Sequence, residues 1–460
     1  MRPHYVTKTE VIVDLITKTG SAVPNQLYTA PANKQHPGYR ALLNYFRTDS
    51  YNMKELEEKI CENDIQEDRV LLIMDTSYYT FESIAGKFDK NDTKIGYINK
   101  DSKPGFGFHV GLLVSTTTGL PIGTGAFEFL VRPFGTENLP PEAMPPKIPE
   151  SEKWFNTAAK VRERIPLSCN LLIVCDREAD VYSFFNQVSH IPNADVVVRF
   201  AQDRILVENQ HRTLKEVLRH LSPQGFYNLE IRAQQGRAAR TARLALSYTT
   251  IKLAYPKNAR KKHGLDAQQT ITVVRAWELD GGLEWKLYTT LPVNSVEDAR
   301  KIVECYEKRW LIEESFRITK TQGLKVESSQ METGEALQRL TALAYLAAIR
   351  TLVLKEGRDI QTPGSLKTHF SAIEIQYLQH IAPTFNGRSG HQINPHPPDS
   401  IAFATWIIGR LGGWKPGVKD RPAGVIALHK GNIRFQDQLR GFILAMKMIA
   451  NKDDPFLYIP

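Results

Sequence analysis

Five side chains that could hold phosphate or a metal ion recur at helical spacing within residues 301–320. On a single helix turning about 100° per residue, they fall within an arc of about 80°; they are Tyr306, Arg309, Glu313, Arg317 and Lys320. One carboxylate is therefore flanked by three cations and a phenol. Ordinary surface pairing between Glu and Arg, worth about 0.2–0.5 kcal/mol a pair, predicts the same pattern. This segment alone leaves a catalytic and a structural interpretation equally open.

Two further carboxylates follow strand-like segments. Asp75 closes the apolar run in residues 69–77, and Asp176 closes the run in residues 170–176. Continuous apolar runs of this length are typical of strands buried on both faces. An acid at the C-terminal tip of such a strand can face a site at the edge of the sheet. Each Asp taken alone could equally cap the next helix.

Asp75, Asp176 and Glu313 together predict a metal-dependent site for phosphoryl transfer. Carboxylates that are brought together repel one another unless a cation lies between them. Hard oxygen ligands suit Mg²⁺, with Mn²⁺ as a substitute. Two such ions, roughly 4 Å apart, would stabilise both the attacking and the leaving oxygen of an in-line displacement. The neighbouring cations would then hold the phosphates of a nucleic-acid strand.

Other catalytic motifs lack support in the sequence. The Gly-Lys pair at 86–87 has neither the upstream Gly nor the following Ser or Thr of a phosphate-binding loop. Gly105 and Gly107 precede a strand, where a dinucleotide-binding motif needs a helix. His391 and His396 lie in a Pro-rich loop without further metal ligands. No Ser/His/Asp or Cys/His arrangement has local support.

The elements around the acids predict an RNase H-like α/β core. After a mostly helical region at residues 1–68, residues 69–77 form the first strand, and residues 105–133 form two strands joined by a turn. A helix, a strand, a helix and a strand follow at residues 151–165, 170–176, 177–190 and 194–200. An RNase H-like layout ends in a helix that carries another acid, and Glu313 supplies that acid here.

A strand-like, basic segment at residues 205–294 delays that last helix. Its cations are opposed by few acids; they are Arg232, Arg237, Arg240, Arg243, Lys252, Lys257, Arg260, Lys261 and Lys262. A solvated β-meander accounts for such charges. In a nucleic-acid enzyme the same residues would contact phosphates.

The chain therefore divides into five expected regions. Within the last of them we expect a helix at 333–355, a loop at 383–400 and further helices to about residue 450. The regions are a helical N-terminal region (1–68), the first part of the RNase H-like core (69–204), a β-rich basic insertion (205–294), the rest of the core with the helix that carries Glu313 (295–332) and a C-terminal helical region (333–460).

Composition places the chain among globular proteins with a polyanionic partner. Its 460 residues are 42% hydrophobic and 24% charged, which is ordinary for a globular protein of several domains. No apolar run approaches the ~18 residues of a membrane span, and the N-terminus has no secretory signal. Four scattered Cys without a CxxC spacing predict reduced thiols in the cytoplasm and no zinc site. A net charge of +9 weakly favours nucleic acid.

Two long motifs make this sequence resemble the DDE transposases of bacterial insertion sequences. The resemblance is to the branch with a Tyr-x2-Arg-x3-Glu-x6-Lys signature, found here as Tyr306, Arg309, Glu313 and Lys320. A second family motif, Asp-Arg-Glu-Ala-Asp after a buried strand, is present at 176–180. The first family acid usually precedes two small hydroxyl residues, as in Asp75-Thr76-Ser77. The similarity extends from about residue 37 to about residue 448 and includes RLGGW at 410–414.

The resemblance implies a cut-and-paste transposase that acts on DNA as a homodimer. Asp75, Asp176 and Glu313 would hold two Mg²⁺ ions, and activated water would nick the transposon end. The freed 3′-OH would attack the opposite strand to form a hairpin, which is reopened and joined to target DNA. Dimerisation would use the C-terminal helices.

DNA contacts follow from the same resemblance. Tyr306 and Arg309 would contact a phosphate near the distorted end, and Lys320 would hold DNA beside the cut. Trp285 matches the tryptophan on which a flipped base stacks, and such stacking is worth about 1–3 kcal/mol. A half-buried Trp with a purely structural role in a strand would explain this residue equally well. Further candidate contacts are Arg177, Arg199 and Arg317, the last at a position where relatives often have Lys.

Two alternatives stay open from the sequence. The region before the first strand is shorter than in the relatives, which predicts impaired recognition of the transposon end by residues 1–68. The chain could thus be a truncated relic that binds DNA without transposing. It could also be a stand-alone RNase H-like nuclease, although the insertion and Trp285 speak against that.

Overall fold

The computed structural model describes most of the chain from residue 52 onward. The described residues are 52–98, 103–135, 151–207, 213–231, 239–256, 266, 268–387, 390–417 and 421–450, with positions 12, 13, 16 and 45. The expected N-terminal helical region lies largely outside them. Its last element is described as α4 (Met53–Ile60), where Asn52 accepts a hydrogen bond from the Lys54 amide as N-cap.

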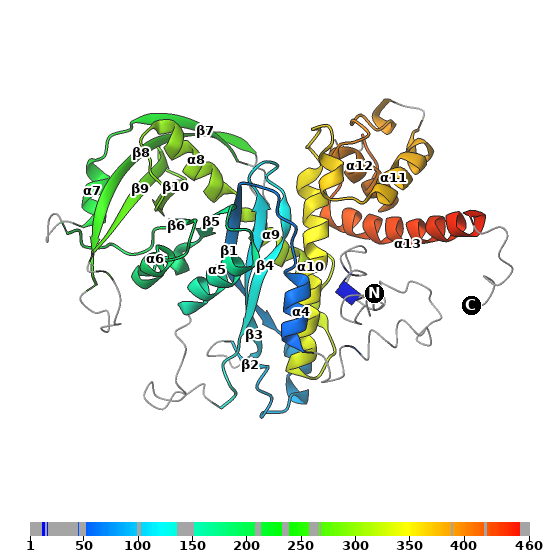
Figure 1. The fold of residues 1–460 in the computed structure, drawn as a ribbon, viewed down its shortest axis with the longest axis horizontal. Coiled ribbons are helices and arrows are strands. Elements are labelled where there is room, and N and C mark those ends of the chain that lie inside the picture. Colours follow the sequence, from blue (N-terminus) through cyan, green and yellow to red (C-terminus); the bar gives the residue numbers. More distant parts are fainter. Residues whose placement is uncertain are drawn as a thin grey trace.

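One mixed sheet of ten strands organises the described residues (Figure 1). The hydrogen-bonded order is β2-β3-β1-β5-β6-β10-β9-β8-β7, and β4 pairs with β3. The strands are β1 (Arg69–Thr80), β2 (Gly96–Tyr97), β3 (Pro104–Ser115), β4 (Pro121–Leu130), β5 (Asn170–Cys175), β6 (Ala194–Arg199), β7 (Gly225–Ile231), β8 (Arg240–Ala254), β9 (Gln268–Glu278) and β10 (Glu284–Thr289).

The first half of the sheet is consistent with an RNase H-like core. β4, β3 and β1 are antiparallel neighbours, whereas β1, β5 and β6 run parallel. The hairpin predicted at 105–133 is confirmed as β3 and β4, and the strands predicted at 69–77, 170–176 and 194–200 are confirmed as β1, β5 and β6. Long apolar runs formed these strands because helices cover both faces of the sheet.

The insertion continues this sheet rather than forming a separate layer. β10 pairs antiparallel with β6, and β9, β8 and β7 follow in turn. The segment also contains the helix α7 (Leu214–His220), which begins with a capping box. The strand-like pattern did not predict this helix. Two of its predicted phosphate contacts are engaged within the protein, Arg240 with Glu278 and Arg243 over the Phe226 ring. Six others lie outside the described residues; they are Arg232, Arg237, Lys257, Arg260, Lys261 and Lys262.

Helices bury alternate side chains of the central strands on the two faces. α5 (Glu152–Arg164) and α6 (Tyr182–Val188) cover one face, and α8 (Val296–Glu307), α9 (Trp310–Lys320) and α10 (Gly334–Gly357) cover the other. Leu72 and Met74 accordingly pack with the first pair of helices, while Leu71 and Ile73 pack with the second group. This alternation decides which way the acids face.

The predicted single helix at 301–320 is wrong in one respect. The structure has two helices there, α8 and α9, separated at Lys308 and Arg309. Three-residue hydrogen bonds join them, from the Arg309 amide to the Tyr306 carbonyl and from the Leu311 amide to the Lys308 carbonyl. Lys308 and Arg309 keep right-handed helical backbone angles, so the break is a local change of the hydrogen-bond pattern within the predicted helix.

The C-terminal helices form their own core around one end of α10 (Figure 1). They are α11 (Ala372–Phe385), α12 (Ile401–Leu411) and α13 (Val425–Ala450), and the expected loop at 383–400 begins only after Phe385. By length and composition, α10 could span a membrane. However, 89% of its apolar 18-residue segment is buried inside the protein, so no membrane protein is indicated. Short 3₁₀ helices lie at Glu82–Lys87, Arg177–Ala179, Val326–Ser328, Ser365–Thr368 and Gly390–Gln392.

Candidate active site

Strand register sets Asp75 and Asp176 side by side. β1 and β5 are parallel neighbours in which Ile73 pairs with Val174 and Met74 with Cys175. The next residue on each strand is an aspartate. Ile73 and Val174 point to the face covered by α8–α10, so Asp75 and Asp176, two residues further on, point the same way. β1 itself continues to Thr80 through its pairing with β3, so Asp75 ends the parallel pairing and not the strand.

α9 brings Glu313 to this edge through Arg309. Arg309 opens α9, and its guanidinium forms an ion pair with Glu313 one turn later. The same guanidinium lies 3.5 Å from Asp75. Arg309 therefore bridges a strand acid and the helix acid. The break before α9 makes this possible, because Arg309 stands at a helix terminus where its side chain can reach the sheet.

Asp176 and Glu313 lie close enough to Asp75 to affect its ionisation. Burial, and then the negative charge of Asp176, raise the pKa of Asp75 to about 7, and Glu313 adds to this effect. Arg309 and the hydrogen bond from the Thr76 amide act in the opposite direction but do not prevent the rise. For Arg309, burial lowers the pKa, but Tyr306, Glu313 and Asp75 outweigh it, so the net shift is upward. An excess of negative charge therefore remains at the carboxyl edge of β1 and β5.

The donor set fits a hard divalent cation in type and in charge. All three candidate ligands are carboxylates. An added cation would offset both the burial of the Asp75 carboxylate and the repulsion from Asp176 that raise the pKa of Asp75. Among the described residues, no three His, Cys, Asp or Glu side chains stand in a metal-holding arrangement as the structure has them. In this structure Arg309 pairs with Asp75 and Glu313. A bound cation would displace Arg309 from between these two acids.

Aromatic residues of two elements line the same edge. Tyr306 at the end of α8 packs edge-on against Trp285 of β10, with ring centroids 5.6 Å apart. The Arg309 guanidinium lies 5.8 Å from the Tyr306 ring. The Tyr306 hydroxyl is buried without a hydrogen-bond partner in the part of the chain that the structure describes. Burial raises the pKa of Tyr306, although the positive charges of Arg309 and Arg199 act to lower it. Tyr306, Arg309, Trp285 and Arg199 are therefore brought together with the acids.

In this structure Lys320 and Arg317 are engaged with other groups of the protein. The Lys320 ammonium donates a hydrogen bond to the Tyr78 carbonyl, lies 3.7 Å from Glu327 and stands over the Tyr79 ring. Burial lowers the pKa of Lys320. Arg317 forms an ion pair with Glu314 and not with Glu313. Arg177 is exposed directly after Asp176. These three cations lie around the acids rather than between them.

Several positioning contacts escaped the sequence analysis. Glu314 is fully buried beside the catalytic candidate Glu313, and its partner Lys355 comes from α10. On the opposite face of the sheet, the Thr76 hydroxyl and buried His109 share a hydrogen bond of 2.9 Å. Two adjacent glutamates gave no signal that one of them is buried, because helical angles do not show which neighbour covers a face. The pairing of Thr76 with His109 depends on strand register, which the sequence did not specify.

The last residue of the Asp-Arg-Glu-Ala-Asp motif has a structural role. Asp180 is buried, accepts hydrogen bonds from the amides of Ala201 and Gln202, and pairs with Arg204. It therefore fixes the segment that follows β6, immediately after Arg199. A carboxylate held by backbone amides and a guanidinium explains why the motif ends in an acid.

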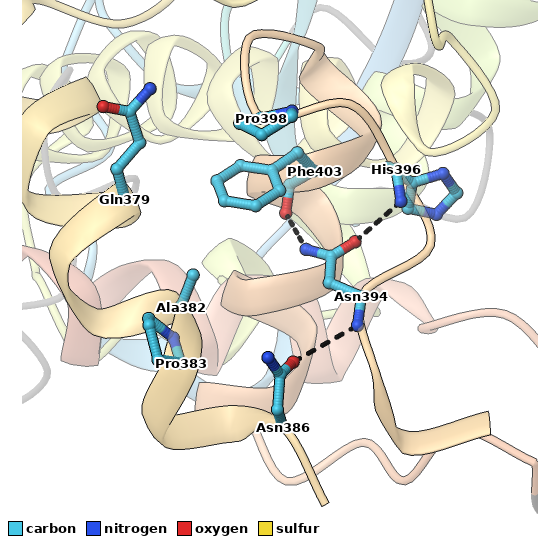
Figure 2. Close-up of a pocket in the computed structure, with 8 residues that line it drawn as sticks. All are labelled: Gln379, Ala382, Pro383, Asn386, Asn394, His396, Pro398 and Phe403. Atoms are coloured by element: carbon cyan, nitrogen blue, oxygen red, sulfur yellow. Dashed lines mark hydrogen bonds between the residues drawn. The ribbon is translucent and has the colours of Figure 1, made fainter. Parts of the chain in front are cut away.

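An open pocket of about 400 Å³ lies in the C-terminal helical region, away from the acids (Figure 2). Asn394 organises it by donating to the Phe403 carbonyl and accepting from the His396 amide. Asn386 in turn accepts a hydrogen bond from the Asn394 amide. None of the three candidate acids lines this pocket. Asn386 and Asn394 are engaged within the pocket, whereas the buried Nδ1 atom of His396 has no hydrogen-bond partner among the described residues. Because no candidate acid lines the pocket, we assign it no catalytic role.

One comparison with known families bears on this site. Residues 225–350 match a family model described as a transposase DDE domain. The matched segment contains β7–β10, α8 and α9 and therefore Glu313, Tyr306 and Arg309. The match supports a DDE transposase, which implies a nucleic-acid-processing enzyme with DNA as its partner. DDE transposases generally use divalent metal ions.

Proposed function

We propose that this protein cuts and pastes DNA, with Asp75, Asp176 and Glu313 as the catalytic carboxylates. The observation that carries the proposal is the bridge made by Arg309 between Asp75 and Glu313, beside Asp176 on the neighbouring strand. Acids from two parallel strands and one helix thus share a single electrostatic site. The family match covers the helix that carries Glu313.

The three carboxylates would hold two Mg²⁺ ions, with Mn²⁺ as a substitute. When bound, such ions activate water and stabilise charge on the transferring phosphoryl group. Arg309, released from the acids, would hold a phosphate of the cut strand together with the Tyr306 hydroxyl, which has no hydrogen-bond partner among the described residues. Lys320, Arg317, Arg177 and Arg199 would contact the DNA on either side.

The reaction would proceed through a hairpin at the transposon end. Water attacks phosphorus, the bond to the 3′ oxygen breaks, and a 3′-OH and a 5′-phosphate are left. The 3′-OH then attacks the opposite strand, which closes the hairpin and frees the flanking DNA. Trp285 packs against Tyr306 at this edge, where a base flipped out of the hairpin could stack on it. Reopening of the hairpin and joining to target DNA would complete the reaction.

The regions outside the sheet would supply DNA recognition and assembly. Residues 1–68 would contact the transposon end, and residues 333–460 would form a homodimer. Exposed apolar side chains near the end of α13 support the second assignment; they are Leu444, Met446, Met448 and Ile449. The insertion at 205–294 would bring basic strands alongside the bound DNA. In a bacterial cell the protein would then lie with the nucleoid in the cytoplasm.

Substitution of Glu313 tests the proposal. A duplex carrying the flanking inverted repeat is incubated with Mg²⁺, and nicked and hairpin products are resolved on a denaturing gel. We expect Glu313→Gln to lower the nicking rate by about 10³-fold or more, because a carboxylate is lost from the metal site. Glu304→Gln, at a half-exposed position on α8 that pairs with Arg300, is the matched control and should nick normally.

The same assay separates the alternatives. Nicking by Glu313→Gln at the wild-type rate would refute the catalytic assignment. Binding of the duplex by the wild-type protein without any nicking would indicate a DNA-binding relic. Nicking without transfer of pre-nicked ends to target DNA would indicate a stand-alone nuclease.

A further inference from the structure

A fully buried carboxylate lies directly next to the candidate catalytic glutamate. Glu314 has no exposed surface, whereas the side chain of Glu313 is 38% exposed. The Lys355 ammonium of α10 lies 2.9 Å from Glu314, and Arg317 of α9 forms a second ion pair with it. Lys355 is itself largely buried, at 13% side-chain exposure. The pair therefore joins the inner side of α9 to α10.

Stability alone does not account for this arrangement. Removing two charges from water costs several kcal/mol per ion, and well-packed apolar residues of similar volume often serve as well or better. A buried ion pair differs from apolar packing because it is directional. A buried carboxylate must stay within a few ångströms of its cations, which limits the rotation and axial shift of its helix more than apolar contacts do. The Glu314 Oε1 atom meets Lys355 as an ion pair and, among the described residues, forms no hydrogen bond.

The rotation of α9 is what orients Glu313. Neighbouring residues on a helix are about 100° apart, so fixing Glu314 against α10 fixes Glu313 on the flank that faces β1. That flank is where Arg309 joins Glu313 to Asp75. Without a directional anchor, a rotation of about 20° at the radius of a glutamate carboxylate would move that group by about 2 Å.

We propose that Glu314 is a positioning residue, which uses Lys355 to set the rotation of α9 and so aims the Glu313 carboxylate at Asp75. The inference rests on the function proposed above. Glu314 touches neither the substrate nor the reacting atoms. It also takes up Arg317, whose guanidinium lies over the Trp310 ring at 5.9 Å, and so holds that cation at the rim of the site.

Two variants separate positioning from stability. Glu314→Gln keeps the shape of the side chain but removes the negative charge that Glu314 offers to Lys355 and Arg317, while Lys355 keeps its second partner, Glu356, at 3.2 Å. The double variant Glu314→Leu/Lys355→Met removes both charges of this pair and keeps the volume, so its thermal midpoint should lie above that of Glu314→Gln. It should stay somewhat below that of the wild type, because Glu356 loses Lys355 as a partner at 3.2 Å. Glu374→Gln is the matched control, because Glu374 is a buried carboxylate paired with Arg350 at 3.0 Å on α11, outside the candidate site.

Three quantities are measured for each full-length variant: the nicking rate per folded molecule, the affinity for Mn²⁺ without DNA by electron paramagnetic resonance, and the affinity for transposon-end DNA. We expect both Glu314 variants to nick about 10- to 100-fold more slowly, since a shift of about 1 Å at a catalytic group costs this much. We expect their Mn²⁺ affinity to fall and their DNA affinity to stay within about threefold. Glu374→Gln should match the wild type in all three.

The outcomes that would overturn the inference are specific. Nicking by the double variant at the wild-type rate, together with recovered stability, would show that Glu314 serves folding alone. Unchanged Mn²⁺ affinity in Glu314→Gln would equally refute the positioning role. A wild-type protein that nicks no end duplex would refute the proposed function instead, so failure of one is distinguishable from failure of the other. Should Glu314→Gln not fold, the double variant still decides.

Discussion

At the scale of residues, the candidate site is a place where like charges are held together against their repulsion. Burial, and then the negative charge of Asp176, raise the pKa of Asp75 to about 7 from an ordinary value of 3.8. Arg309 partly offsets the repulsion by pairing with Asp75 and Glu313. A strongly raised carboxylate pKa is expected at a site that binds a cation, where function and not stability determines the arrangement of the charges.

Asp75→Asn should therefore stabilise the metal-free protein. The folded state holds the Asp75 proton up to about pH 7 and the unfolded state only to about pH 3.8, so stability falls as pH rises between these values and the loss is complete above pH 7. Asparagine removes the charge but also a partner of Arg309, which leaves a net gain of about 1–3 kcal/mol at pH 8.

Urea unfolding in EDTA measures this gain at pH 8 and again at pH 4, where it should shrink. The nicking rate of Asp75→Asn should fall with that of Glu313→Gln. Lower stability of the variant at pH 8 would mean that the attraction of Arg309, and not carboxylate repulsion, dominates the site.

At the scale of elements, glycines allow α12 and α13 to pack backbone against backbone. A Cβ atom on Gly412 would lie 1.8 Å from the Ala427 carbonyl oxygen, and one on Gly431 would lie 1.8 Å from that of Ile408. Gly413 follows with a φ of +92°, a conformation that other residues rarely adopt. The RLGGW motif is thus explained by helix packing and the turn after α12.

We expect Gly412→Ala to destabilise the protein by about 3 kcal/mol or more, because neither backbone can move aside without disturbing its helix. Gly441→Ala is the matched control on α13, where a Cβ atom would meet nothing within 4 Å. That exposed helical position should gain about 0.5–1 kcal/mol. Thermal unfolding of both variants measures the contrast, and equal effects would contradict the close packing of the two helices.

The elements also show where sequence reasoning succeeds and where it fails. Apolar runs predicted β1, β5 and β6 because strands covered on both faces carry no polar alternation. The helix at 301–320 was predicted as continuous because nothing at Lys308 or Arg309 marks a break, neither Gly nor Pro. At the break Arg309 pairs with Asp75, a tertiary contact that the sequence does not reveal. Helical spacing likewise gave no sign that Arg317 pairs with Glu314.

At the scale of the whole molecule, α10 links the sheet to the C-terminal helices. Most of its length packs in the core that contains β1 and α9, and Leu354 near its end belongs to the core of α11–α13. Arg350 of α10 donates a hydrogen bond of 2.5 Å to the His369 carbonyl and pairs with Glu374 of α11. Any loss of order at this junction would separate the proposed dimerisation region from the catalytic core.

Acid should weaken this junction through His369. Burial, and then the charge of Arg350, lower the pKa of His369 to about 4 from 6.5, so the folded protein keeps this imidazole neutral. As pH falls from 6.5 to about 4 the unfolded chain binds a proton that the folded chain does not, and stability is lost by about 2–3 kcal/mol. His369→Asn, which titrates in neither state, should lose correspondingly less.

Urea unfolding at pH 8 gives the packing cost of the variant, because the imidazole is neutral there in both states of the wild type. The difference between the two proteins at pH 5, corrected by that at pH 8, isolates the titration. A wild-type stability that falls with pH no more steeply than that of His369→Asn would exclude this histidine as the acid-sensitive group of the junction.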